Sequence, residues 1–115
     1  MDEAKAVPGT ELREALQAAV RRIVETVRPR TVILFGSWAE GRATTDSDVD
    51  LLVVAQTDDP LGLSVALRGQ ARAGGLAAPL DLLVVTPDEW DRLSAIPGHA
   101  LHEAALSGVR LYDAA

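Results

Sequence analysis

The fold is decided by the segment from residue 31 to residue 54, which reads TVILFGSWAEGRATTDSDVDLLVV. Its first five residues are β-branched, aliphatic or aromatic and lie between Pro29 and Gly36, so we expect a short buried strand over residues 31–35. Apolar residues return after an acidic stretch and predict a second strand over residues 49–55. The residues that follow Gly36 predict a short turn or helix.

The elements on either side follow from apolar periodicity and from helix start signals. Asp59 and Pro60 provide a cap and a first residue for one helix. Thr86 and Glu89 have the spacing of a capping box. The expected elements are a helix over residues 10–28, a helix over 60–73, a strand over 79–85, a helix that begins at Thr86, a helix over 98–107 and an edge strand over 109–112. Helices that alternate with short apolar strands predict an α/β or α+β fold, in which one small sheet is covered on both faces.

Composition limits what such a chain does. The 115 residues, 48% of them hydrophobic and 24% charged, fit one globular domain over residues 10–115, preceded by a flexible lead-in over residues 1–9. The absence of cysteine excludes disulfides, thiolate zinc sites and a cysteine nucleophile. A net charge of −6 argues against an extended nucleic-acid surface. We find no signal peptide and no apolar run long enough for a membrane helix, and we expect a cytoplasmic protein.

Three acidic residues indicate where the chemistry lies. Asp48 and Asp50 are two residues apart at the start of a strand, so their carboxylates point to the same face. Two negative charges held close together need a cation, and Mg²⁺ is the oxygen-preferring ion that fits them. Asp81 lies within the apolar strand over residues 79–85, where an acid needs a partner or a metal. If the two strands are neighbours, the three carboxylates form a two-metal site for phosphoryl or nucleotidyl transfer.

A glycine and a serine complete the candidate site. Gly36 directly follows a buried strand, where it allows backbone N–H groups to approach a phosphate. A helix N-terminus at this point would favour an anion, and the Ser37 hydroxyl can donate to a phosphate oxygen. The loop does not match the Walker A pattern, because Gly41 is followed by Arg42 and Ala43.

At these residues the chain resembles the nucleotidyltransferase domain of the DNA polymerase β superfamily, and most of all its minimal nucleotidyltransferases. The likeness covers nearly the whole chain and implies a small mixed β-sheet flanked by helices. The motif residues are Gly36-Ser37, Asp48-Val49-Asp50 eleven residues after Ser37, and Asp81 on a later strand.

The resemblance also implies roles for individual residues. Asp48, Asp50 and Asp81 would be the catalytic residues and would ligate two Mg²⁺ ions. The expected nucleotide-binding residues are Gly36, Ser37, Arg42 and Ser47. The implied reaction transfers AMP from ATP to an acceptor hydroxyl and releases pyrophosphate. Minimal nucleotidyltransferases are often encoded beside a HEPN-domain protein, so the implied partner is a HEPN-type toxin and the implied role is that of its antitoxin.

One position departs from the pattern of the family. Many minimal relatives carry arginine at the position of Glu40, and here Arg42 is the candidate substitute for it. A glutamate that faced the nucleotide would repel its phosphates. Glu40 therefore leaves a second hypothesis open, in which the protein is an antitoxin that binds its partner and neutralises it by contact alone. A nucleotidyltransferase that acts on a small molecule such as an aminoglycoside is a further alternative, and a homo-oligomer is compatible with it.

Overall fold

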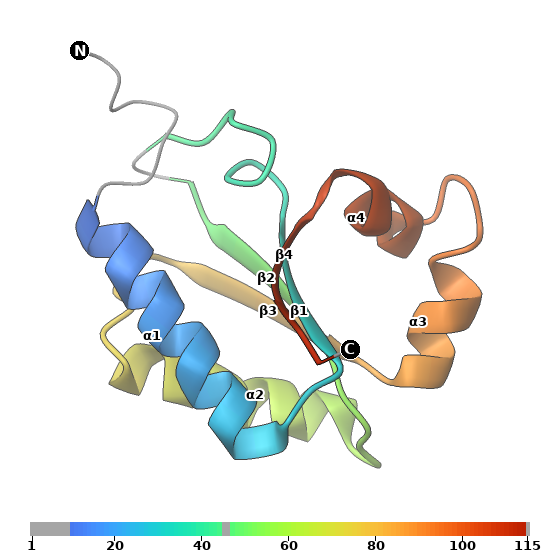
Figure 1. Cartoon of the computed structure of the whole chain (residues 1–115), viewed down its shortest axis with the longest axis horizontal. Coiled ribbons are helices and arrows are strands. Elements are labelled where there is room, and N and C mark those ends of the chain that lie inside the picture. Colours follow the sequence, from blue (N-terminus) through green and yellow to red (C-terminus); the bar gives the residue numbers. More distant parts are fainter. Residues whose placement is uncertain (1–9, 45–46, 115) are drawn as a thin grey trace.

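The computed structural model describes residues 10–44 and 47–114 (Figure 1). Its helices and strands, in chain order, are α1 (Thr10–Val27), β1 (Thr31–Phe35), β2 (Val49–Val54), α2 (Pro60–Ala73), β3 (Leu80–Val85), α3 (Pro87–Leu93), α4 (Ala100–Ser107) and β4 (Val109–Asp113). The expected mixed α/β fold is confirmed. The predicted lead-in over residues 1–9 lies outside the described residues. None of the described helices is long and apolar enough to cross a membrane.

The strands form one mixed sheet in the order β3-β2-β1-β4. Strand β1 runs antiparallel to both β2 and β4, whereas β2 and β3 are parallel. Helix α2 is the crossover between the two parallel strands, as such a connection requires. The sheet therefore brings β2 and β3 side by side, which is the adjacency on which the predicted acidic site depends.

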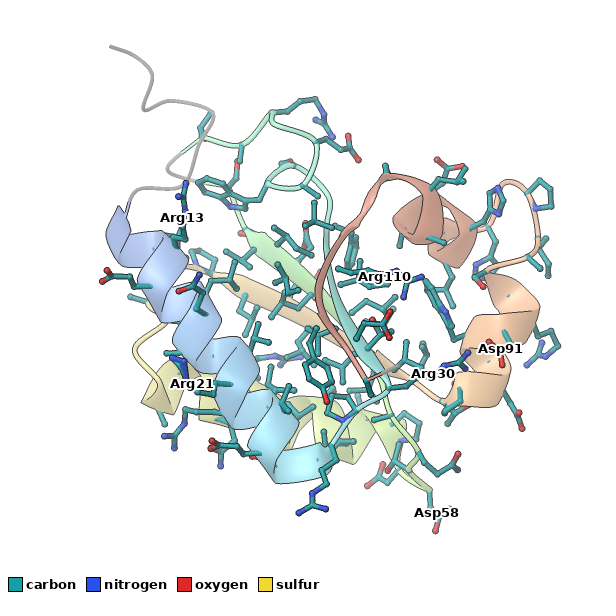
Figure 2. The ribbon with its side chains drawn as sticks, viewed as in Figure 1. Arg13, Arg21, Arg30, Asp58, Asp91 and Arg110 are labelled. Atoms are coloured by element: carbon teal, nitrogen blue, oxygen red, sulfur yellow. The ribbon has the colours of Figure 1, made fainter. Side chains whose placement is uncertain are left out.

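Helices cover the sheet on both faces, with α1 and α2 on one side and α3 and α4 on the other (Figure 1). The larger core lies under α1 and α2, and its central residues are Leu16, Val20, Ile23, Val32, Leu51, Val53, Leu67 and Val84. The smaller core lies under α3 and α4 and contains Ile33, Leu52, Val54, Val85, Trp90, Leu101 and Ala104. An ion pair joins the two layers at one end of the sheet, where Arg30 contacts Asp91 of α3 at 3.1 Å (Figure 2).

Local capping explains where the helices begin. The Asp59 side chain accepts a hydrogen bond from the Gly62 N–H at the start of α2. Thr86 and Glu89 form the predicted capping box of α3. Helix α4 begins two residues later than predicted because the ring of His99 accepts the Leu101 N–H, which makes His99 the N-cap and Ala100 the first helical residue.

Of the short turn or helix expected after Gly36, the structure shows a turn over residues 36–41, so no helix N-terminus follows Gly36. It closes through hydrogen bonds from the Glu40 N–H to the Gly36 carbonyl and from the Arg42 N–H to the Ser37 carbonyl. Coverage of the sheet is also incomplete, because the Leu83 side chain on β3 is 46% exposed. Strand β3 is an edge strand, and α3 and α4 do not extend over this part of it.

Candidate active site

Asp50 and Asp81 lie at the same level of two neighbouring parallel strands. The register of β2 and β3 pairs these two residues directly, so their Cα atoms are about 4.8 Å apart, the usual spacing of adjacent strands. Side chains alternate along a strand, which places Asp50 on the same face as Leu52 and Val54 of the smaller core. Both carboxylates therefore lie on the face that carries α3 and α4. Asp50 is half-buried and Asp81 is exposed.

Asp48 contributes a third negative charge to the same region. It precedes the first residue of β2 and is exposed to solvent. Burial raises the pKa of Asp50 above its usual value of 3.8, and the charges of Asp81 and Asp48 raise it further. The strand register and these charges place the three acids near one another, and their role as metal ligands stays a prediction.

Gly36 provides the space that the Asp50 carboxylate occupies. Phe35, the last residue of β1, pairs with Asp50 in the antiparallel register. Gly36 follows at once with a φ of +75°, and a Cβ atom built on it would overlap the Oδ2 atom of Asp50. A residue with a side chain here would be strained in its backbone and would collide with the acid. The predicted phosphate-binding loop therefore begins against the central carboxylate of the site.

The rest of the loop is organised around a buried tryptophan. Trp38 packs in the larger core, and its Nε1 atom donates a hydrogen bond to the Ser47 carbonyl at 3.3 Å. The Ser47 hydroxyl accepts the Thr44 N–H at 2.9 Å. Trp38 is therefore a packing residue that anchors the loop. In the structure the Ser47 side chain shapes the loop, and its predicted contact with a nucleotide stays a prediction.

Arg42 is held by Glu40, a contact that sequence reasoning missed. The Nε and Nη2 atoms of Arg42 donate to the Oε1 atom of Glu40 at 3.0 and 2.6 Å. Residues two apart on a helix do not face each other, so no helical pattern predicts this pair. The turn over residues 36–41 brings them together. Both side chains lie at the surface, where the Arg42 side chain is 63% exposed.

The acidic residues fit Mg²⁺ as ligands. Carboxylate oxygens are the ligands that this ion prefers, and a cation would neutralise the charges of Asp81 and Asp48, which add to the effect of burial on the pKa of Asp50. Within residues 10–44 and 47–114, no three acidic or histidine side chains converge into a preformed metal cage. Mg²⁺ is usually bound through one or two carboxylates and keeps several waters for exchange with phosphate oxygens.

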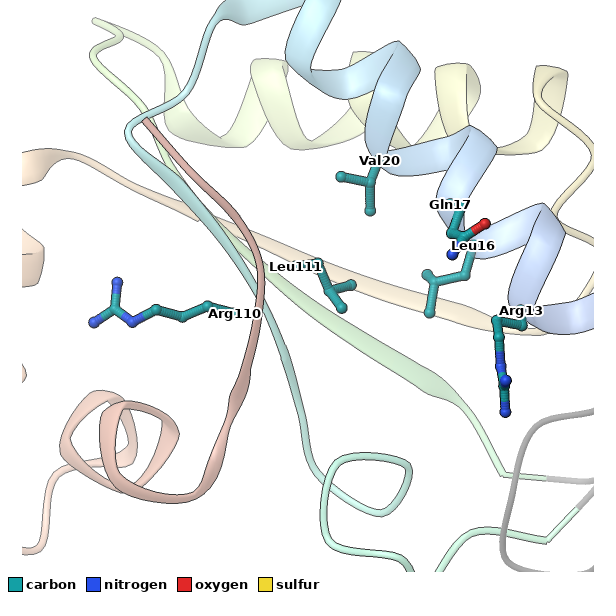
Figure 3. A pocket seen from close by; sticks show the side chains of 6 residues that line it. All are labelled: Arg13, Leu16, Gln17, Val20, Arg110 and Leu111. Carbon is teal, nitrogen blue, oxygen red and sulfur yellow. The ribbon is translucent and has the colours of Figure 1, made fainter. Parts of the chain in front are cut away.

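A separate cavity of about 320 Å³ lies between α1 and β4. Figure 3 shows Leu16 and Val20 on α1 near Leu111 on β4, whereas the Arg110 side chain extends away from the helix. The cavity is lined by Arg13, Leu16, Gln17, Val20, Arg110 and Leu111. None of these residues is acidic, and the cavity lies on the face opposite Asp50 and Asp81. It is therefore not part of the acidic site.

Comparisons with known proteins agree with this geometry. Residues 13–107 match the family described as the nucleotidyltransferase domain. The fold is similar to the crystal structure of a candidate nucleotidyltransferase from Sulfolobus solfataricus, with a TM-score of 0.63 and 18% sequence identity. That similarity covers 99% of this chain and 93% of the other. No curated protein matches the sequence significantly. The chain therefore belongs to the nucleotidyltransferase domain family of the DNA polymerase β superfamily.

Proposed function

We propose that the protein is a Mg²⁺-dependent nucleotidyltransferase that transfers AMP from ATP to a hydroxyl group of a HEPN-type partner protein, and that it acts as the antitoxin of that partner. The observation that carries the proposal is the register of β2 and β3, which pairs Asp50 with Asp81. Asp48 adds its charge to the same site. Three carboxylates on adjacent strands are the ligand set that in-line nucleotidyl transfer requires.

In the proposed reaction, the acceptor hydroxyl oxygen forms a bond to the α-phosphorus of ATP. The bond from that phosphorus to the oxygen bridging to the β-phosphate breaks, and pyrophosphate leaves with the electron pair. Asp81 is exposed and accepts the hydroxyl proton. Asp48, Asp50 and Asp81 would hold Mg²⁺, which would supply charge neutralisation for the pyrophosphate. The turn at Gly36 and Ser37 positions the triphosphate beside Asp50.

The proposed acceptor is a protein because the acids lie on an open surface. Asp48 and Asp81 are both exposed. A hydroxyl on the surface of a folded partner can reach carboxylates that are presented in this way. The resemblance to minimal nucleotidyltransferases, which are often encoded beside HEPN-domain proteins, supports a partner of that class.

The test is incorporation of label from α-labelled ATP into the partner in the presence of Mg²⁺. We expect the wild type to label the partner and Asp50→Asn to lose the activity by a large factor. Asp88→Asn is the matched control, because Asp88 is an exposed carboxylate in the first turn of α3, outside the acidic site. Equal labelling by wild type and Asp50→Asn would disprove the proposed mechanism.

A second candidate function is neutralisation of the partner by contact alone. The ion pair between Glu40 and Arg42 favours this candidate, because Glu40 engages the Arg42 guanidinium that was expected to bind phosphate. Survival assays with Asp50→Asn separate the two candidates. If the variant still protects cells from the toxin, the protein acts by contact, whereas loss of protection together with loss of labelling supports transfer.

A further inference from the structure

Strand β3 forms an edge of the sheet that the described chain leaves open. The strand order is β3-β2-β1-β4, so β3 pairs with β2 on one side and with no described strand on the other. Natural edge strands usually carry charges or proline that prevent pairing with another chain. The β3 sequence LDLLVV carries one charge, whereas the opposite edge strand β4, VRLYD, carries two. The open edge of β3 is therefore poorly protected against strand addition.

Exposed apolar side chains lie on both sides of this edge. Leu83 is 46% exposed on the face of the acids. Leu61 and Val65 of α2 are 77% and 59% exposed. Leu61 lines a cavity of about 300 Å³ together with Leu82 and Leu83, so this flank of α2 lies beside β3. A partner that covers all three side chains must cover the edge from both faces, as an added strand with its own helix does.

The flank of α2 also carries charges of opposite sign, one just before the helix and one in its second half. Asp58 precedes the helix and points away from the molecule (Figure 2). Arg68 lies in the second half of the helix, lines the same cavity, and has a buried Nε atom without a hydrogen-bond partner. In a two-fold pair about an axis perpendicular to the sheet, the two α2 helices run antiparallel, so the first half of each lies beside the second half of the other. Arg68 of one copy then faces the region of Asp58 of the second copy, and the charges are complementary.

We propose that the edge formed by β3 and α2 is the interface at which two copies of this chain associate. The two β3 strands pair in an antiparallel manner about a two-fold axis at Leu83, and the two sheets become one. Leu83 then packs against Leu83 of the second copy on the face of the acids. Leu61 and Val65 pack against the second α2 on the other face. The two acidic sites lie on the same face of the combined sheet.

The first test is sedimentation velocity over a range of protein concentrations. We expect the wild type to associate into a dimer. Val65→Glu places two like charges near the two-fold axis and removes buried apolar surface, so we expect dimer affinity to fall about tenfold or more. Leu106→Glu is the matched control, since Leu106 is 70% exposed on α4, which contributes nothing to this edge. A wild type that stays monomeric, or two variants that weaken the dimer equally, would overturn the proposal.

The second test uses the absence of cysteine from the chain. Leu83→Cys places one thiol beside its counterpart across the antiparallel pair, where the strand spacing permits a disulfide. We expect a covalent dimer after mild oxidation on a non-reducing gel. Leu106→Cys, which is more exposed, controls for random collision and is expected to stay monomeric. Equal cross-linking of both variants contradicts this interface.

A charge exchange tests the orientation of the two helices. Arg68→Glu is expected to weaken the dimer, and addition of Asp58→Arg to the same chain is expected to restore it, because each contact then has its signs reversed. A double variant weaker than either single variant contradicts the antiparallel arrangement. None of these measurements depends on transferase activity, so they remain informative if the proposed function is wrong.

Discussion

The Asp50 carboxylate lies where a side chain on Gly36 would be. A Cβ atom on Gly36 would overlap Oδ2 of Asp50, and the φ of +75° at Gly36 is a conformation that other residues adopt with strain. The end of β1 and the start of β2 thus meet at one close contact between the loop and the acid. The glycine that the sequence suggested for phosphate binding also makes room for the Asp50 carboxylate, the proposed metal ligand.

We predict that Gly36→Ala lowers the free energy of unfolding by about 1–2 kcal/mol and also lowers transfer activity, because it both strains the backbone and displaces Asp50. Gly41→Ala is the control, since Gly41 has a φ of +76° but open space around its Cβ position. Urea denaturation is expected to show a loss of stability for both variants and a larger loss for Gly36→Ala, because only this variant also collides with Asp50. Only Gly36→Ala is expected to lose activity. Activity losses of equal size would mean that strain in the turn, and not contact with Asp50, is responsible.

We predict that Asp50→Asn makes the metal-free protein more stable at neutral pH. The folded state raises the pKa of Asp50 above 3.8, so the ionised carboxylate destabilises the fold. This destabilisation is absent below pH 3.8 and appears as pH rises through the raised pKa. Thermal unfolding against pH should therefore separate the wild type from the variant on the neutral side only. Asp88→Asn is the control and should show no such gain.

Magnesium is predicted to stabilise the wild type. An ion that binds the folded state alone, at ten times its dissociation constant, adds about 1.4 kcal/mol. Thermal unfolding with and without Mg²⁺ is the measurement, and EDTA is expected to reverse the shift. Asp50→Asn and Asp81→Asn should lose most of the effect. A shift of the same size in these variants would place the ion elsewhere on the protein.

We predict that Glu40→Gln lowers the KM for the nucleotide. The change releases Arg42 from an ion pair with an N–O distance of 2.6 Å, and the free guanidinium can then contact phosphate. The pair is exposed, so the expected effect is modest, about two- to fivefold. Arg42→Ala is expected to raise KM. If steady-state kinetics show the same KM for both variants and the wild type, Arg42 does not bind the nucleotide.

Much of the fold was predictable because the signals were local. The ends of β1 were predicted correctly from Pro29 and Gly36, which flank it. The ends of α2 were predicted correctly from Asp59 and Gly74. Errors of a residue or two arose at ends where a particular side chain decides, as at His99, whose ring caps α4. The segment after Gly36 was left open as a turn or a short helix, because a few residues carry too little periodicity to separate the two.

The sequence by itself determined the motif residues, the order of the elements and the face shared by Asp48 and Asp50, since strand periodicity acts between near neighbours in the chain. Only the tertiary structure decided that β3 lies parallel to β2 with Asp81 beside Asp50. It alone decided that Glu40 holds Arg42 and that Leu83 lies exposed at an open edge. These features depend on strand order, register and turn geometry. Such contacts join residues that no local pattern relates.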